Sequence, residues 1–232
     1  MFINNLFKGS KVIKIFLLII LLISTLFSLS LDDANNLYKE GDIKTAIKLY
    51  AKLSRDGDDK ATFKLGTIYY KGKDIKRDLS KAMNYFKKAS AYGDDKAKYN
   101  SAIIYGLKEY KEHSYLKAYN IFLDLAQNSY AKAQNKVGQY LLYGLGIKKD
   151  YRLAVKWFEQ AFFVGGYKPA SCNLSLMYAT GRGVFVNLGR ARKLAQYGYK
   201  IKVPLCIKVF KEFNLQKYDT DKGFKLGFYR DL

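Results

Sequence analysis

The sequence is poor in the residue types on which many enzymes and disulfide-rich domains depend. It contains one histidine and two cysteines in 232 residues. A single histidine, His113, gives little material for a His-based metal site or a Ser–His–Asp triad. His113 stands in a polar stretch, where we expect a solvated loop residue. No metal-binding or cofactor-binding residues are therefore predicted.

Serine-based hydrolysis has equally little support. No Gly-x-Ser-x-Gly segment is present, and the Ser-x-x-Lys pattern of serine β-lactamases occurs twice, at Ser114–Lys117 and Ser129–Lys132. Two matches are what chance gives in a lysine-rich chain, and neither Ser-Asp-Asn nor Lys-Thr-Gly accompanies them. Both serines stand at predicted helix starts, where a hydroxyl caps backbone N–H groups. No catalytic residue is predicted.

The positive charge comes almost entirely from lysine and not from arginine. The net charge is +21, and it is still +18 without the three lysines of residues 1–31. A basic surface attracts anionic partners, but arginine is the usual choice for bidentate phosphate recognition. Lysine spread over helix faces favours solubility, so nucleic acid is not an expected partner. An electrostatic binder of anionic surfaces remains one alternative.

The N-terminal 31 residues differ from the rest. Lys8, Lys11 and Lys14 precede an apolar run of 17 residues, Ile15–Leu31. A basic start followed by an apolar stretch is typical of a secretory signal peptide. The run is also at the short limit for a membrane-spanning helix, so an uncleaved anchor through residues 12–31 is the competing interpretation. Either one predicts export to the periplasm or cell surface, with anchoring to the inner membrane in the second case.

A 36-residue repeat organises the remainder of the chain. Several independent positions keep the same phase: Gly57, Gly93, Ser129 and Gly165; Ala61, Ala97 and Ala133; Ala82, Ala118 and Ala154; Phe86, Phe122 and Phe158. Periods of 20 to 50 residues indicate solenoids. We therefore predict an all-α fold, an α-solenoid superhelix of antiparallel helix pairs.

The repeat divides the chain into a degenerate hairpin at 32–56, four units at 57–92, 93–128, 129–164 and 165–200, and a C-terminal part at 201–232. Apolar spacing predicts helices at 59–71 and 79–91 in the first unit. Acidic pairs such as Asp58–Asp59 are expected to cap helix starts. Residues 203–214 suggest a capping helix, and the basic tail 217–232 is expected to be loosely held. The fourth unit carries one inserted residue near Gly165.

Glycine turns in the later units add a family resemblance. The third unit has Gly144-Leu145-Gly146-Ile147 and the fourth has Gly181-Arg182-Gly183-Val184, each followed by Asp or Asn and then Ala. Together with the recurring phase, this pattern resembles Sel1-like repeats, which are related to tetratricopeptide repeats. The second unit departs from it, because Leu107–Ser114 lacks the Gly-x-Gly turn.

The resemblance implies an adaptor that binds other proteins, in bacteria as an exported scaffold and in some cases in host interaction. Some family members are cysteine-rich proteins with β-lactamase or penicillin-binding activity and a disulfide in each repeat. Two cysteines fit that subgroup poorly, so an envelope hydrolase is kept only as the alternative. Cys172 and Cys206 allow either one disulfide between the last repeat and its cap or two separate buried thiols.

The first helices of such repeats line a groove in related helical-repeat proteins. Stepping by one period along these helices gives a series of lysine and asparagine residues, which we call the ladder: Lys60, Lys64, Lys96, Asn100, Lys132, Lys136 and Asn173. Ammonium and amide donors in a row suit an acidic peptide or a C-terminal carboxylate. The competing interpretation is that lysine occupies most exposed positions of this chain.

Overall fold

The computed structural model describes residues 30–200 and 202–224, and within these ranges the secondary structure is helical, with no strand. Most of the predicted signal segment, residues 1–29, lies outside the described residues. The first described helix, α2 (Leu31–Glu40), begins with a capping box in which the Ser30 hydroxyl and the Asp33 carboxylate each accept the other residue's backbone N–H. Among the described helices, none has the length and apolar character needed to cross a membrane.

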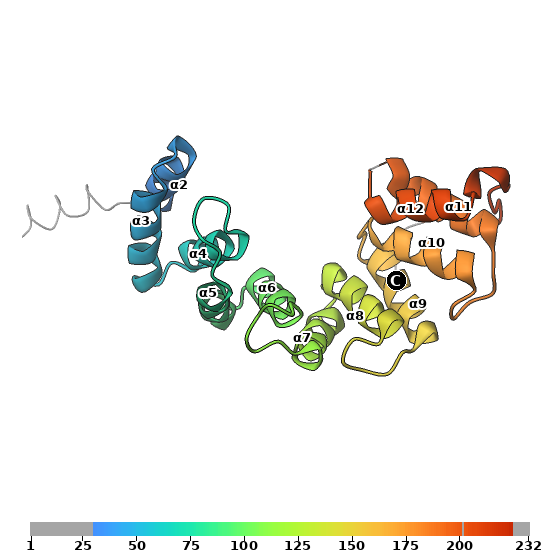
Figure 1. Ribbon diagram of the computed structural model, residues 1–232, viewed down its shortest axis with the longest axis horizontal. Coiled ribbons are helices and arrows are strands. Elements are labelled where there is room, and N and C mark those ends of the chain that lie inside the picture. Colours follow the sequence, from blue (N-terminus) through green and yellow to red (C-terminus); the bar gives the residue numbers. More distant parts are fainter. Residues whose placement is uncertain (1–29, 201, 225–232) are drawn as a thin grey trace, which may run out of the picture. The chain divides into compact units, whose positions relative to one another are not determined.

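The chain divides into two compact units, with the boundary in the sequence after Asp78. The first contains α2, α3 (Ile43–Arg55) and α4 (Asp59–Lys71), with α3 packed against both of the others (Figure 1). Its core is built from small and large apolar side chains that recur at helical spacing, including Ala46, Tyr50 and Leu65. The predicted repeat 57–92 is thus divided, because α4 belongs to this unit and the following helix to the next.

The second unit is a series of helices in which each packs against the next along the chain (Figure 1). Its members are α5 (Leu79–Ala91), α6 (Asp95–Tyr105), α7 (Tyr115–Gln127), α8 (Ala131–Tyr143), α9 (Tyr151–Glu159), the π-helix η1 (Gln160–Val164), α10 (Ala170–Thr180), α11 (Leu188–Lys200), α12 (Pro204–Glu212) and the short 3₁₀ helix η2 (Leu215–Lys217). Helix α10 contacts α9, α11 and α12. The predicted helices 59–71 and 79–91 are confirmed as α4 and α5.

The repeat exists because equivalent positions carry the core. Phe86, Phe122 and Phe158 have no exposed surface, and the alanines four residues before each are equally buried. Their helices α5, α7 and α9 begin 36 residues apart. A large ring on one turn and a small methyl on the preceding turn let neighbouring helices approach closely while the space between them stays filled.

Helix starts follow the predicted capping in part. Asp58 and Asp94 accept N–H groups of the first turns of α4 and α6, and Ser114 does the same for α7. The prediction was wrong for Ser129, which precedes the N-cap of α8. Ser129 has φ +62°, the left-handed conformation that Gly57 and Gly93 adopt at the equivalent positions. It therefore belongs to the turn between α7 and α8 and caps no helix.

The loop inside each repeat is closed by one backbone hydrogen bond at an equivalent place. The residue before the second helix donates its N–H to a carbonyl near the end of the first helix: Asp78 to Tyr69 at 3.0 Å, Ser114 to Tyr105 at 2.9 Å, Asp150 to Leu141 at 3.1 Å and Asn187 to Tyr178 at 3.0 Å. The repeat 93–128, which lacks the glycine turn, closes in the same way. Its loop therefore keeps the length of the motif without its glycines.

The single inserted residue of the fourth repeat, 165–200, is accommodated at the end of α9. There the helix widens into η1, and the Gly165 N–H donates to the Gln160 carbonyl at 2.9 Å. A π-turn adds one residue to a helix while the next repeat keeps its own pattern. The left-handed position of the repeat then falls on Gly166, with φ +63°.

The tail up to Phe224 is held against α11, which corrects the expectation of a loose tail for residues 217–224, whereas 225–232 lie outside the described residues. Arg190 forms an ion pair with Asp221 at 3.0 Å, and Asn187 donates to the same carboxylate at 3.3 Å. Lys193 donates to the backbone carbonyls of Asp221 and Phe224. Polar tail residues are thus fixed by cations of α11, a pairing that the local sequence of the tail does not reveal.

The two cysteines form a disulfide. Cys172 of α10 and Cys206 of α12 are both fully buried, and their Cα atoms lie 4.7 Å apart. A Cβ atom built on Gly198 of α11 would lie 2.1 Å from the Cys206 sulfur. The absence of a side chain at Gly198 therefore allows α11 to pass directly over the bond. The predicted capping helix corresponds to α12, which the disulfide ties to the last repeat.

Candidate functional site

The ladder residues of the first unit, Lys60 and Lys64, are both exposed on α4. In the second unit the ladder is less uniform. Lys96 and Lys132 are exposed in the first turns of α6 and α8, whereas Asn100 and Lys136 are half-buried. Burial lowers the pKa of Lys136. Exposed ammonium groups are thus present at Lys60, Lys64, Lys96 and Lys132, whereas the second ladder position of α6 and of α8 is half-buried.

Asn173 does not belong to an exposed ladder, and its assignment as a binding residue needs correction. It is only 2 % exposed, and its Nδ2 donates to Oδ1 of Asn135 on α8 at 2.8 Å. Its sequence position matches Lys136, but α10 lies deep in the unit, between α9, α11 and α12. A side chain at this position is therefore enclosed, and Asn173 joins α10 to α8.

His113 and Lys117, which the sequence analysis considered for catalysis, both contact neighbouring aromatic side chains. His113 is half-buried, with Nδ1 3.0 Å from the Tyr105 carbonyl and its ring edge-on to Tyr115. It is therefore less solvated than its polar surroundings suggested. Lys117, the lysine of the first Ser-x-x-Lys match, extends its ammonium over the Tyr105 ring at 5.6 Å from the centre, while its backbone N–H is capped by Ser114.

The two glycines of each Gly-x-Gly turn have different physical roles. Gly144 and Gly181 adopt left-handed conformations that end α8 and α10. At Gly146 and Gly183 the loop comes close to the preceding repeat. A Cβ on Gly183 would lie 2.4 Å from the Tyr151 carbonyl oxygen at the start of α9. The motif therefore places each loop directly on the second helix of the repeat before it.

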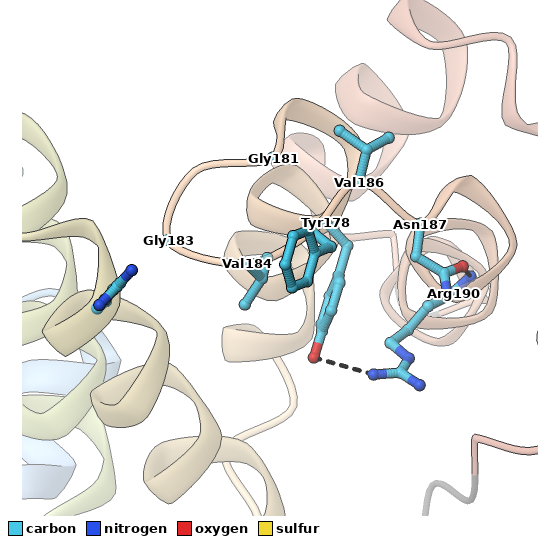
Figure 2. Close-up of a pocket in the computed structure, with 9 residues that line it drawn as sticks. Tyr178, Gly181, Gly183, Val184, Val186, Asn187 and Arg190 are labelled. Carbon is cyan, nitrogen blue, oxygen red and sulfur yellow. Dashed lines mark hydrogen bonds between the residues drawn. The ribbon is translucent and has the colours of Figure 1, made fainter.

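Seating the last loop on α9 leaves a pocket beside it, which we call the last-repeat pocket (Figure 2). Its volume is about 760 Å³, and it lies between Arg152 of α9, the loop 181–187 and the side chains of Tyr178 and Arg190. Figure 2 shows the Tyr178 hydroxyl close to the Arg190 guanidinium, which donates to it at 3.3 Å. An apolar loop thus faces two cations from different helices.

The tip of this loop exposes large apolar side chains. Phe185 is 96 % exposed and Val186 60 %. Adjacent exposed apolar side chains mark interaction sites more often than isolated exposed residues do. Sequence reasoning missed this pair because it used Gly181–Val184 only as part of the repeat motif. The available signal was an apolar Phe–Val pair in a loop position that Lys148–Lys149 occupies one repeat earlier.

Two of the seven arginines of the chain, Arg152 and Arg190, line this pocket, and Arg182 belongs to its loop. Arg190 is engaged, with Asp221 at 3.0 Å and the Phe224 ring centre at 4.4 Å. Arg152 is exposed and forms no hydrogen bond or ion pair with any residue in the described ranges. Arg182, at the loop tip, lies 5.9 Å above the Tyr151 ring. General lysine richness does not account for these arginines, and Arg152 is a pocket cation with no ionic partner among the described residues.

A second concavity continues the surface toward the preceding repeat. It shares Arg152 and Gly183 with the last-repeat pocket and adds Lys148 and Lys149 from the loop 144–150. Asp150 also lines it, but its carboxylate accepts the Leu153 N–H at 2.9 Å as a helix cap. The two loops of the last two repeats therefore present one basic surface with an apolar end at Phe185.

Comparison with known families and relatives gives a consistent result. The family model described as Sel1 repeat matches residues 37–58, 59–94, 131–162 and 168–200, together about half of the chain. Protein sel-1 homolog 2 is 33 % identical over 110 residues in Rattus norvegicus and 32 % over 105 in Homo sapiens. The chain spans about 16 % of the length of these curated relatives. The matches leave 95–130 between them, where α6 and α7 form the same helix pair.

Solved structures show the fold. A Sel1 repeat protein from Oxalobacter formigenes has a TM-score of 0.70 at 22 % identity, covering 83 % of this chain and 79 % of its own. A protective antigen present in uropathogenic Escherichia coli strains, which displays an SLR fold, has a TM-score of 0.65 at 23 % identity and covers 76 % of this chain and 38 % of its own. The predicted all-α solenoid of helix pairs is confirmed by these similarities.

Proposed function

The chain belongs to the Sel1 repeat family, and from this premise we propose that it is an exported scaffold that binds another protein through the last-repeat pocket. The observation that carries the proposal is the nearly complete exposure of Phe185 in a pocket that the exposed Arg152 also lines. Aromatic and arginine side chains supply most of the energy at protein interfaces. A partner segment with an apolar side chain next to a carboxylate matches this pair.

Two features support export. The N-terminal sequence has the basic start and apolar run of a secretory signal or anchor. The second feature is the buried Cys172–Cys206 disulfide, because disulfides persist mainly in oxidising compartments. A bacterial periplasm or cell surface is such a place. If the chain is located at the cell surface, the proposed partner includes a protein of the host.

The test is a pull-down from envelope extract with residues 30–232, a segment that keeps the Ser30 cap of α2. Phe185→Ser and Arg152→Glu are each expected to reduce recovery of a specific partner at physiological salt at least tenfold, as loss of an interface hot spot does. The surface variants should keep the helicity of the wild type, because both residues are exposed.

Matched controls lie on the same unit. Val164→Ser removes an apolar side chain that is 54 % exposed, and Lys156→Glu reverses an exposed charge on α9. Both are expected to retain the partner. Equal losses with the control pair, or recovery that disappears for every variant as salt rises, would mean that the overall positive charge binds without a defined site.

A further inference from the structure

A separate concavity lies in the first compact unit, among α2, α3 and α4. Its volume is about 630 Å³. Two helices that both pack on α3 supply most of its lining, with Lys39 from α2 and Lys64 and Lys71 from α4. It includes one member of the predicted ladder, Lys64, whereas Lys60 lies outside its lining. We call it the first-unit pocket.

The first-unit pocket carries a positive charge that no ion pair within the described residues neutralises. Lys39, Lys64 and Lys71 are exposed, and none of them forms an ion pair with another residue of the described chain. Two carboxylates lie close by. Asp32 lines the pocket, and Asp74 accepts a hydrogen bond from the Tyr38 hydroxyl. Three ammonium groups thus exceed the two carboxylates at the site, and within the described residues they have no ionic partner.

Neutral donors complete the arrangement. The Tyr50 hydroxyl, on a side chain that is 1 % exposed, donates to Oδ1 of Asn35 at 2.8 Å. That bond fixes the amide and leaves its Nδ2 group as a donor. Burial and the contact with Asp74 raise the pKa of Tyr38 to about 12, so its hydroxyl stays protonated at neutral pH. Ammonium and amide N–H groups around one cavity are the donors that recognise carboxylates.

We propose that the first-unit pocket binds an acidic peptide segment of a partner protein through its side-chain carboxylates. Among the described residues no arginine lines the pocket, and arginine is the usual residue for bidentate phosphate binding. The Asp32 carboxylate also repels a phosphate dianion more strongly than it repels a carboxylate. The first-unit pocket and the last-repeat pocket share no residue, so each proposal can fail without the other.

Fluorescence anisotropy tests the proposal with residues 30–232 and a short labelled peptide of glutamate and alanine, blocked at both ends. We expect binding of this peptide and not of its glutamine counterpart. Lys64→Ala and Lys71→Ala should each weaken binding about tenfold, the usual effect of losing one charge-assisted hydrogen bond. Lys52→Ala on α3 removes an exposed charge that does not line the pocket, and it should leave binding unchanged.

Three results would overturn the proposal. The first is equal binding of the glutamine peptide, and the second is equal weakening by Lys52→Ala, which would reduce the effect to net charge. The third is tighter binding of a single-stranded oligonucleotide of the same charge, which would make the pocket a phosphate site. Phe185→Ser is expected to leave binding of the acidic peptide intact, which separates this result from the test of the last-repeat pocket.

Discussion

Phe122→Ala is expected to lower the free energy of unfolding of the second unit by about 3 to 5 kcal/mol. The ring has no exposed surface, and its centre lies 5.3 Å from that of Tyr99 and 5.5 Å from that of Tyr140. It therefore joins α6, α7 and α8 in one cluster. Removing it takes away the transfer free energy of the side chain and leaves a cavity that three helices cannot all close.

Urea unfolding followed by circular dichroism measures this effect, with Leu116→Ala as the control. Leu116 lies on the same helix but is 51 % exposed, so we expect a change below about 1 kcal/mol. Because repeats contact mainly their neighbours, the loss should appear as a separate early transition if the second unit unfolds in parts. A Phe122→Ala protein as stable as the Leu116→Ala protein would contradict the assignment of the repeated phenylalanines to the core.

Replacing both cysteines with serine is expected to destabilise the C-terminal end of the second unit by about 3 to 4 kcal/mol. The disulfide closes a loop across 34 positions of sequence, from α10 to α12. In the reduced chain the denatured state regains the freedom of that loop, and two fully buried positions receive hydroxyls that need hydrogen-bond partners. Helix α12 should lose most of its protection.

Hydrogen exchange of Pro204–Glu212 measures the loss directly. Wild type treated with a reductant serves as the matched control, because it opens the bond without introducing hydroxyls. We expect both samples to exchange faster in α12 than oxidised wild type, while α6 and α7 exchange at unchanged rates. Unchanged protection of α12 in the reduced wild type would mean that packing alone holds this helix.

The 36-residue phase predicted most of the helices in this chain, because each repeated position has one physical task. Phe86, Phe122 and Phe158 fill equivalent gaps, and glycine or serine takes the left-handed position between repeats. Such tasks depend on neighbours only one repeat away. Spacing along the sequence is therefore a reliable guide to helix ends and to which side chains are buried.

The candidate sites were harder to predict because they depend on where helices lie in space. Asn173 shares the sequence position of Lys136, yet it is buried because α10 is covered by α9, α11 and α12. Asp221 pairs with Arg190 across 31 residues, so the tail gives no local sign of being held. Phe185 occupies a loop position where earlier repeats carry polar residues, and the periodic pattern contains no expectation for it.

The main proposal is that Phe185 and its pocket contact another protein. The sharpest measurement places a photo-crosslinking amino acid at position 185 in cells, with position 164 as the exposed control. We expect one discrete crosslinked species from position 185 that is absent from position 164 and lost when Arg152→Glu is added. No crosslink at 185, or the same products from both positions, would contradict the assignment of the last-repeat pocket as the binding site.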